Sequence, residues 1–210
     1  MMTTVGEDYS SLESIKATGG IRPDEHWEEN QSNARRNAKI AHDLGIDLVT
    51  FHAGYIPEER SNERQTMIDR IKVIAEIFGG NGIRVGLETG QERAESLLDV
   101  LADPAMSGVG VNFDPANMIL YNMGDPAEAL ELLQNHLVQV HMKDAIATRT
   151  HGTWGSEVPA GQGDVDWGHY FQFIQSLKKD LNIVIEREAG DCRIDDIVSA
   201  RILAEKHGCG

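Results

Sequence analysis

The sequence has 210 residues, which suffice for one sizeable hydrophobic core but fall short of two comfortable domains. The formal net charge of -15 disfavours a polyanionic partner such as a nucleic acid, and two cysteines, Cys192 and Cys209, are too few for a disulfide framework or a thiolate zinc site. The first residues lack the pattern of a secretory signal and no apolar run reaches membrane-spanning length, so we expect a cytoplasmic protein without a membrane partner.

Strand and helix patterns alternate along the chain, as they do in βα units. Helices are expected from Pro23 to Leu44, Ser61 to Phe78, about 92–102, Asp125 to about His136, Asp166 onward, and about 195–207. Strands are expected at 46–52, 83–88, 109–114, 137–141 and 182–186. No strand is expected before residue 46, and residues 145–165 are expected to form a long loop.

Four of the expected strands end in a residue that can bind a divalent metal: Glu88, Asp114, His141 and Glu186. Side chains alternate between the two faces of a strand, so the positions of opposite parity in each run, which are all apolar, share the other face. Apolar positions suit a layer of covering helices. The four polar residues should therefore meet at the C-terminal ends of parallel strands, where β/α barrels have their active sites.

These patterns predict an α/β fold of the parallel (β/α) TIM-barrel type. A closed barrel needs eight strands and eight helices in about 250 residues, whereas five strands and six helices are expected here. We therefore expect one domain over residues 1–210 that forms a partial barrel. It is either an open sheet or the C-terminal part of a barrel that lacks its first three strands.

The four strand-end residues form an oxygen-rich donor set that suits Mn²⁺, Mg²⁺ or Co²⁺, with Zn²⁺ also possible. Taken alone, His141 in an apolar strand is more often a core histidine, and Glu88 could be a strand end that meets solvent. Four such residues on one face favour the metal site, because unpaired buried carboxylates are costly. Glu188 shares the face of Glu186 and is the alternative ligand, but Glu186 directly ends the apolar run.

Six short motifs resemble the xylose isomerase-like barrels, which include sugar and sugar-phosphate isomerases and epimerases. They are FHAG (51–54), LETG (87–90), NFDPAN (112–117), HMKD (141–144), GQGDVDW (161–167) and IERE (185–188). Their order and spacing follow the fourth to eighth strands of that family, and the resemblance covers the chain from about residue 8. It implies a TIM-barrel fold in which the four metal ligands are Glu88, Asp114, His141 and Glu186.

The resemblance also implies roles around the substrate. His52 matches a histidine after the fourth strand that usually contacts substrate, although a hydrogen-bonded pocket wall is an equal alternative. Lys143 and Asp144 would lie around the substrate or orient the ligands, a surface ion pair being the alternative. Asn117, in the NFDPAN motif, is a further substrate-binding candidate. The long loop adds three residues that are expected to line the pocket: Arg149, His151 and Trp154.

The function that follows from the resemblance is a metal-dependent isomerase or epimerase acting on a sugar, a sugar phosphate or a related polyol. The metal would chelate the carbonyl and an adjacent hydroxyl oxygen of this small-molecule substrate. One of Glu88 and Glu186 would then remove the proton of the substrate C–H that lies between the two chelated oxygens. The other would return a proton, and the reaction would pass through an enediolate. His52 or Lys143 would assist at oxygen. Association into a homo-oligomer is left open.

Three alternatives remain. Relatives that dehydrate a cyclic polyol, such as an inosose or 3-dehydroshikimate, look alike at these motifs, so a lyase is the runner-up. An abasic-site endonuclease shares the fold, but that group generally has a histidine where Asn117 stands, and the acidic charge argues against DNA. The last alternative is an inactive fragment, or a subunit that completes itself by association through exposed barrel edges.

Overall fold

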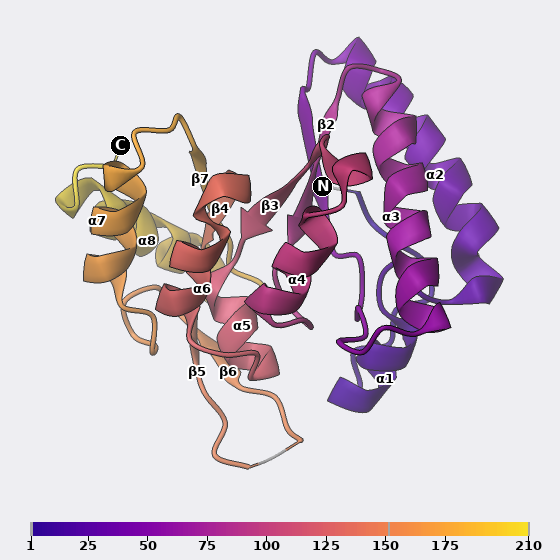
Figure 1. The fold of residues 1–210 in the computed structure, drawn as a ribbon. Coiled ribbons are helices and arrows are strands. Elements are labelled where there is room, and N and C mark those ends of the chain that lie inside the picture. The colour runs from indigo at the N-terminus through magenta and orange to yellow at the C-terminus, as the bar shows by residue number, and fades with distance from the viewer. Residues whose placement is uncertain (1, 151, 210) are drawn as a thin grey trace.

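The computed structural model describes residues 2–150 and 152–209, and its central feature is a parallel sheet (Figure 1). The strand order is β1-β2-β3-β4-β7 and every neighbouring pair is parallel. The strands are β1 (Leu48–Phe51), β2 (Arg84–Glu88), β3 (Val109–Phe113), β4 (Leu137–Met142) and β7 (Asn182–Ile185). In the described part of the chain β1 does not pair with β7, so the predicted partial barrel of the TIM type is confirmed.

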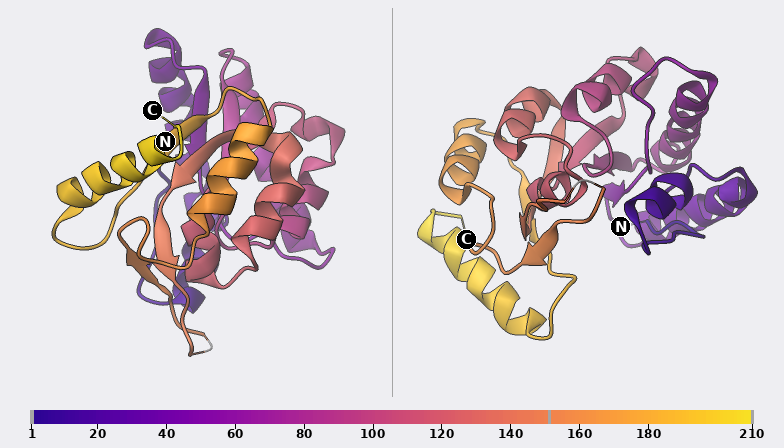
Figure 2. Two further views of the ribbon diagram at one scale, coloured as in Figure 1. Left: turned by 90° about the vertical axis from the view of Figure 1, so that its left-hand side faces the viewer. Right: turned by 90° about the horizontal axis from the view of Figure 1, so that it is seen from below.

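Helices surround one side of this sheet, and Figure 2 shows them as an arc from α2 and α3 at one end to α7 and α8 at the other. The helices are α1 (Leu12–Thr18), α2 (Asp24–Asp43), α3 (Asn62–Gly79), α4 (Ala94–Leu101), α5 (Pro115–Tyr121), α6 (Pro126–Leu133), α7 (Trp167–Ser176) and α8 (Arg193–Lys206), with 3-10 turns η1 (Pro104–Met106) and η2 (Gln134–His136). In the described part of the chain, no helix combines the length and the apolar character that a bilayer crossing requires.

Two of these helices, α1 and α5, go beyond the six that the sequence predicts. Each has 7 residues, too few for an apolar period of 3.6 to stand out. Helix α5 begins directly after β3, and the side chain of Asp114 caps it by accepting a hydrogen bond from the backbone N–H of Asn117 at 2.9 Å. The cap fixes Asp114 at the sheet edge.

The segment 145–165 also differs from the expected loop. It contains an antiparallel hairpin of β5 (Asp144–Ile146) and β6 (Ser156–Val158). Strands of 3 residues carry almost no alternation pattern, which is why sequence reasoning missed them. The hairpin returns Trp154 and Glu157 to the strand ends that carry the candidate site.

The predicted division of the sheet into two faces holds, with one correction. The side chains of Val85, Leu87, Val111 and Phe113 are buried on the helix-covered face. Val138 was expected there as well, but the β3–β4 register shifts so that Val111 pairs with Leu137 and Asn112 with Gln139. This bulge places Val138 on the inner face, which is the face that carries the four strand-end residues.

Glycines on the inner face make room for the bulged residue. A Cβ atom on Gly110 would lie 2.3 Å from Cγ1 of Val138, and one on Gly86 would lie 3.2 Å from its Cγ2. In a regular strand the alternation of side chains would turn Val138 toward the helices. The bulge between Leu137 and Gln139 turns it toward these glycines instead.

Candidate metal centre and pocket

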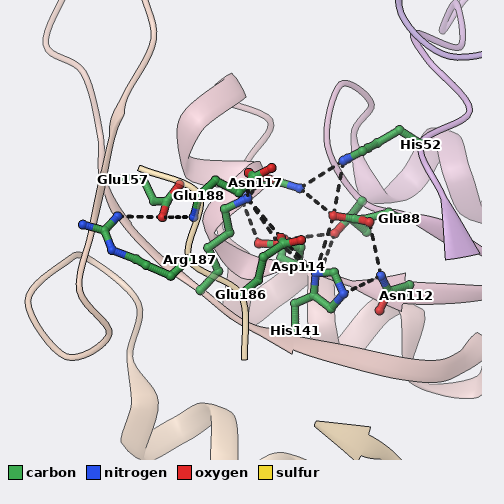
Figure 3. A network of polar contacts seen from close by, with 12 residues as sticks. His52, Glu88, Asn112, Asp114, Asn117, His141, Glu157, Glu186, Arg187 and Glu188 are labelled. Atoms are coloured by element: carbon green, nitrogen blue, oxygen red, sulfur yellow. Dashed lines mark hydrogen bonds and ion pairs between the residues drawn. The ribbon is translucent and has the colours of Figure 1, made fainter. Parts of the chain in front are cut away.

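Four neighbouring strands bring Glu88, Asp114, His141 and Glu186 to one point (Figure 3). Each offers one ligand atom, and these four atoms lie within 4.8 Å of one another. Nδ1 of His141 is the centre of the group, at 3.2 Å from Oδ2 of Asp114, 3.3 Å from Oε2 of Glu186 and 3.5 Å from Oε1 of Glu88. The four side chains that the strand alternation predicted to share one face therefore do converge.

The cluster is buried and strongly electronegative. Burial alone would lower the pKa of His141, but hydrogen bonds to Asp114, Glu186 and Glu88 raise it to about 12. Burial would raise the pKa of Glu88, yet the attraction of His52 and hydrogen bonds from His141 and His52 hold it well below its usual range. Three carboxylates around one imidazole therefore stabilise positive charge at their centre.

A second layer of amides fixes these side chains. Asn112, which is fully buried, places its Nδ2 2.9 Å from Nε2 of His141 and 3.3 Å from Oε2 of Glu88. Gln139 donates to Oδ1 of Asn112 at 3.2 Å. The contact at Nε2 sets the plane of the His141 ring and so the direction of Nδ1. Asn112 and Gln139 each lie two residues before a strand-end residue, Asp114 and His141, so the alternation of a strand turns them to the same face.

Lys143 is buried beside the cluster and not on the surface. Its Nζ lies 3.1 Å from Oε2 of Glu186, contacts Oε2 of Glu188, and donates to Oδ1 of Asn117 at 3.3 Å. Burial would lower the pKa of Lys143, but the attraction of Asp114, Glu186 and Glu188 holds it above its ordinary value. The ammonium group therefore remains charged and holds the two glutamates after β7 in place.

His52 and Asn117 close the other side of Glu88. Nε2 of His52 lies 3.2 Å from Oε1 of Glu88, and Nδ2 of Asn117 donates to the same oxygen at 3.1 Å. Burial would lower the pKa of His52, but the attraction of Glu88 raises it to about 9. Both residues line the pocket above the cluster, where the sequence analysis expected substrate contacts.

The donor set fits a divalent metal ion. Three carboxylates and one imidazole are ligands that Mg²⁺, Mn²⁺, Co²⁺ and Zn²⁺ accept, and the four donor atoms are close enough to surround one ion. Glu186 belongs to the cluster and its Oε2 lies 3.3 Å from Nδ1 of His141, whereas Glu188 reaches Lys143 instead. The geometry therefore favours Glu186 over its alternative Glu188.

A pocket of about 200 Å³ opens above the cluster. Its lining comprises Met2, Thr3, Thr4, Glu7, Tyr9, His52, Glu88, Asn117, Leu120, Tyr121, Trp154, Glu186 and Glu188. Trp154 is thus in the lining, whereas Arg149 is exposed on the hairpin and does not belong to it. His151 lies outside the described residues.

The N-terminal segment and Tyr121 are pocket residues that sequence analysis missed. The backbone N–H of Met2 donates to the carbonyl of Thr50 at 2.8 Å, which lays the N-terminal segment along the edge of β1. Glu7 and Tyr9 follow at the pocket. They lie in a polar stretch with neither a strand nor a helix pattern, so only the tertiary contact with β1 reveals them.

The sequence model of the family described as "Xylose isomerase-like TIM barrel" matches residues 10–204. An uncharacterised protein of Methanocaldococcus jannaschii is 27% identical over 181 residues, which are 80% of this chain and 58% of the relative. The chain spans 58% and 43%, about half, of the two curated relatives it matches.

Solved structures share the fold. A xylose isomerase domain protein from Planctomyces limnophilus has a TM-score of 0.89 and 30% identity, over 98% of this chain and 75% of that one. A Mycobacterium smegmatis xylose isomerase-like TIM barrel protein in complex with magnesium has a TM-score of 0.73 and 16% identity, over 90% and 70%. An L-ribulose 3-epimerase has a TM-score of 0.69 and 13% identity, over 90% and 71%. The last two show a likeness of fold alone.

Proposed function

Because this chain belongs to the xylose isomerase-like TIM barrel family, we propose that it is a metal-dependent isomerase or epimerase of a sugar or related polyol. The observation that carries the proposal is the convergence of Glu88, Asp114, His141 and Glu186 at the floor of a pocket. Two of the four, Glu88 and Glu186, also line that pocket, so carboxylates can serve both a metal ion and a bound substrate.

The four converging residues would hold the ion. Once bound, the ion would act as a Lewis acid on a substrate carbonyl and make the neighbouring C–H more acidic. Asn112 keeps the His141 ring in the plane that aims Nδ1 at the carboxylates. Lys143 keeps Glu186 and Glu188 in place through contacts with one oxygen of each.

Glu186 and Glu88 differ in how freely they can move a proton. Oε2 of Glu186 contacts His141 and Lys143, while among the described residues no hydrogen bond reaches its Oε1. We assign proton removal to Glu186 Oε1 for this reason. Glu88 has both oxygens engaged, with His52 and Asn117 at Oε1. His52 can pass a proton to Glu88, which would deliver it on the second face of the reacting carbon.

A dehydratase of a cyclic polyol is the second candidate. Water elimination needs a base for the C–H and an acid for the departing hydroxyl group. Nζ of Lys143 lies 3.1 Å from Glu186, so a cationic donor and a carboxylate are neighbours here. We rank this reaction second because Lys143 already contacts Glu186, Glu188 and Asn117, and it does not line the pocket.

The proposal is tested with the 210-residue protein loaded in turn with Mn²⁺, Mg²⁺, Co²⁺ and Zn²⁺. Aldoses, ketoses and cyclic polyols are incubated in deuterium oxide and followed by NMR. An isomerase or epimerase that works by proton transfer incorporates solvent deuterium at the reacting carbon and yields an isomer, whereas a dehydratase yields a product that has lost water. Absence of both from every metal-loaded form would refute the proposal.

Two variants separate the roles of the glutamates after β7. Glu186→Gln should abolish exchange and weaken metal binding, because the cluster loses one of its four donors. Glu188→Gln should keep the metal affinity within a few fold, because Glu188 contacts Lys143 and lies outside the cluster. Full turnover and metal affinity in Glu186→Gln would contradict the assignment.

A further inference from the structure

The lining of the pocket includes an aromatic wall. The rings of Tyr121 and Trp154 meet edge to face, with centroids 4.8 Å apart and an interplanar angle of 62°. Tyr121 ends α5 and Trp154 comes from the β5–β6 hairpin. Their common position in the lining presents a firm apolar surface beside an otherwise polar floor.

The hairpin is held firmly against α5, which keeps Trp154 in place. The backbone N–H of Gly155 donates to the carbonyl of Leu120 at 3.2 Å. The two backbones are so close that a Cβ on Gly155 would lie 3.2 Å from Cα of Leu120 and 2.8 Å from the carbonyl oxygen of Ile146. Trp154 therefore stands directly before a close backbone contact that depends on a glycine.

The N-terminal segment adds fixed polar groups to the same pocket. Oε1 of Glu7 accepts hydrogen bonds from Oγ1 of Thr4 at 2.7 Å and from the backbone N–H of Gly20 at 2.9 Å. Oε2 of Glu7 accepts from the hydroxyl of Tyr9 at 3.1 Å. The carboxylate is thus held from one side, and a hydroxyl group in the pocket can donate to the remaining lone pairs of Oε2.

The size of the pocket suits one small ring. Its volume of about 200 Å³ lies below the roughly 300–1,000 Å³ that is typical of pockets for drug-sized ligands. A single monosaccharide or cyclitol is the size of ligand that suits this volume. An aromatic wall and fixed hydroxyl acceptors are the contacts that such a ring needs, since it has C–H faces and hydroxyl edges.

The charge of the pocket disfavours a phosphate group. Glutamates 7, 88, 186 and 188 belong to the lining, and among the residues that the structure describes the lining contains neither arginine nor lysine. The nearby ammonium group of Lys143 is buried and already bound to Glu186 and Glu188. Even with a divalent ion bound, the ion, the ammonium group of Lys143 and the protonated ring of His52, which pairs with Glu88, leave one of the five carboxylates, Asp114 included, uncompensated. A phosphate dianion needs unpaired cationic or N–H donors to replace its hydration.

We propose that this pocket selects a neutral, unphosphorylated polyol of single-ring size, which lays a C–H face on Trp154 and Tyr121 and directs hydroxyl groups to Glu7. The proposal rests on the function proposed above, because it names the substrate class of the same site. It assigns Trp154 and Glu7 as specificity-determining residues.

Calorimetric titration of the Mn²⁺-loaded protein with matched pairs tests the substrate class: ketopentoses, ketohexoses and inososes, each beside its phosphate ester. We expect each neutral sugar that binds to do so at least tenfold more tightly than its ester. Equal or tighter binding of the esters, or no binding by any member of either series, would overturn the inference. Binding of neutral sugars without deuterium exchange or dehydration would refute the proposed function and support the substrate class.

The residue assignment is tested by Trp154→Ala, with Trp154→Phe as the conservative variant and Trp27→Phe on α2 as the control. Trp154→Ala should weaken binding of the preferred neutral sugar roughly tenfold, while Trp154→Phe recovers most of the affinity. Glu7→Gln should weaken binding of the neutral sugar and reduce the ratio of its affinity to that of the phosphate ester. Wild-type affinity in Trp154→Ala would overturn the stacking assignment.

Discussion

Arg187 and Glu157 form a buried ion pair that ties the β5–β6 hairpin to the end of β7. Nη1 of Arg187 lies 2.6 Å from Oε1 of Glu157, and the two side chains are only 9% and 7% exposed. The same oxygen of Glu157 accepts the backbone N–H of Glu188 at 2.9 Å, and Nε of Arg187 lies 2.9 Å from Oδ2 of Asp196. Glu157 therefore positions the segment that carries Glu186 without touching the cluster itself.

Replacing Glu157 with Gln should weaken metal binding although Glu157 is not a ligand. The neutral amide leaves the buried Arg187 guanidinium with the carboxylate of Asp196 but without that of Glu157, which costs about 2 kcal/mol of folding free energy. The segment after β7 then loses its anchor, and loss of such outer contacts typically lowers metal affinity about 10- to 100-fold. Metal affinity is measured by competition with a chromophoric chelator, at a temperature where circular dichroism shows a folded protein.

Glu205→Gln on the exposed side of α8 is the control, because it removes one carboxylate from the same protein far from the hairpin. Loss of stability in Glu157→Gln with unchanged metal affinity would mean that the ion pair supports the fold alone.

Asn112 offers a test of the layer behind His141. Asn112→Ala removes the amide that lies 2.9 Å from Nε2 of His141 and 3.3 Å from Oε2 of Glu88. We expect a metal affinity about 10-fold or more lower, since the ring of His141 can rotate, together with a loss of about 1–3 kcal/mol from unpaired buried groups. Isothermal titration with Mn²⁺ measures the first effect and urea unfolding the second. Wild-type Mn²⁺ affinity would show that packing alone orients the ring.

Local patterns in the sequence were enough to predict the five strands of the parallel sheet, their shared face and the four converging residues. Buried parallel strands are short apolar runs with a period of two, so the residue that ends each run marks both the strand end and the face. The ligand-type residues lie at these ends, and the structure brings them together without any loop having to be predicted.

Features that depend on contacts between distant segments could not be predicted in this way. The bulge at Val138 arises from the pairing of β3 with β4, and a one-residue shift leaves no mark in a run of apolar residues. Glu7 reaches the pocket because the N-terminal segment lies along β1, and Glu157 reaches Arg187 because a hairpin of two very short strands folds back. Neither Glu7 nor Glu157 belongs to a periodic pattern.

Asp144 should be essential for the stability of the loop before α7. Its carboxylate accepts five hydrogen bonds, from the backbone N–H groups of Ala145, Gly161, Gly163 and Val165 and from Nε1 of Trp167. In Asp144→Asn, either orientation of the amide turns an NH₂ group toward at least two of these donors. We expect a loss of about 3 kcal/mol and a melting temperature roughly 6–12 °C lower.

Differential scanning calorimetry measures this loss, with Asp164→Asn as the control in the same loop. Asp164 is exposed and accepts one hydrogen bond, from the backbone N–H of Ala147, so its replacement should shift the melting temperature by no more than about 3 °C. Equal shifts in the two variants would contradict a special role for Asp144.

Metal binding should release a proton from His141. Hydrogen bonds to three carboxylates raise the pKa of His141 to about 12 against the effect of burial, so the metal-free site holds an imidazolium at neutral pH. The Nε2–H of an imidazolium requires the neighbouring amide of Asn112 to present Oδ1 in place of Nδ2, which a rotation of that amide supplies. A metal ion needs the neutral imidazole, and its apparent affinity should therefore rise about tenfold per pH unit between pH 6 and 8. Calorimetry in buffers of different ionisation enthalpy counts the released protons. An affinity independent of pH would show that the metal-free His141 is already neutral.

Glu92 should make the metal-free protein less stable as the pH rises. Burial raises the pKa of Glu92 from 4.5 to about 7, although the attraction of His52 opposes the rise. The folded-state pKa exceeds that of the unfolded chain, so the stability linked to this proton is fully present below about pH 4.5 and is lost as the pH passes through about 7. A shift of this size corresponds to roughly 3 kcal/mol at pH 8.

Glu92→Gln isolates this contribution, because the amide is neutral at every pH and similar in shape. The variant should melt at a higher temperature than the wild type at pH 8 and at nearly the same temperature at pH 5, with a chelator present in both measurements. Glu58→Gln, at an exposed position after β1, is the control and should leave the difference between the two pH values unchanged. A stability gain in Glu92→Gln that is equal at pH 5 and pH 8 would mean that the proton on Glu92 is not its cause.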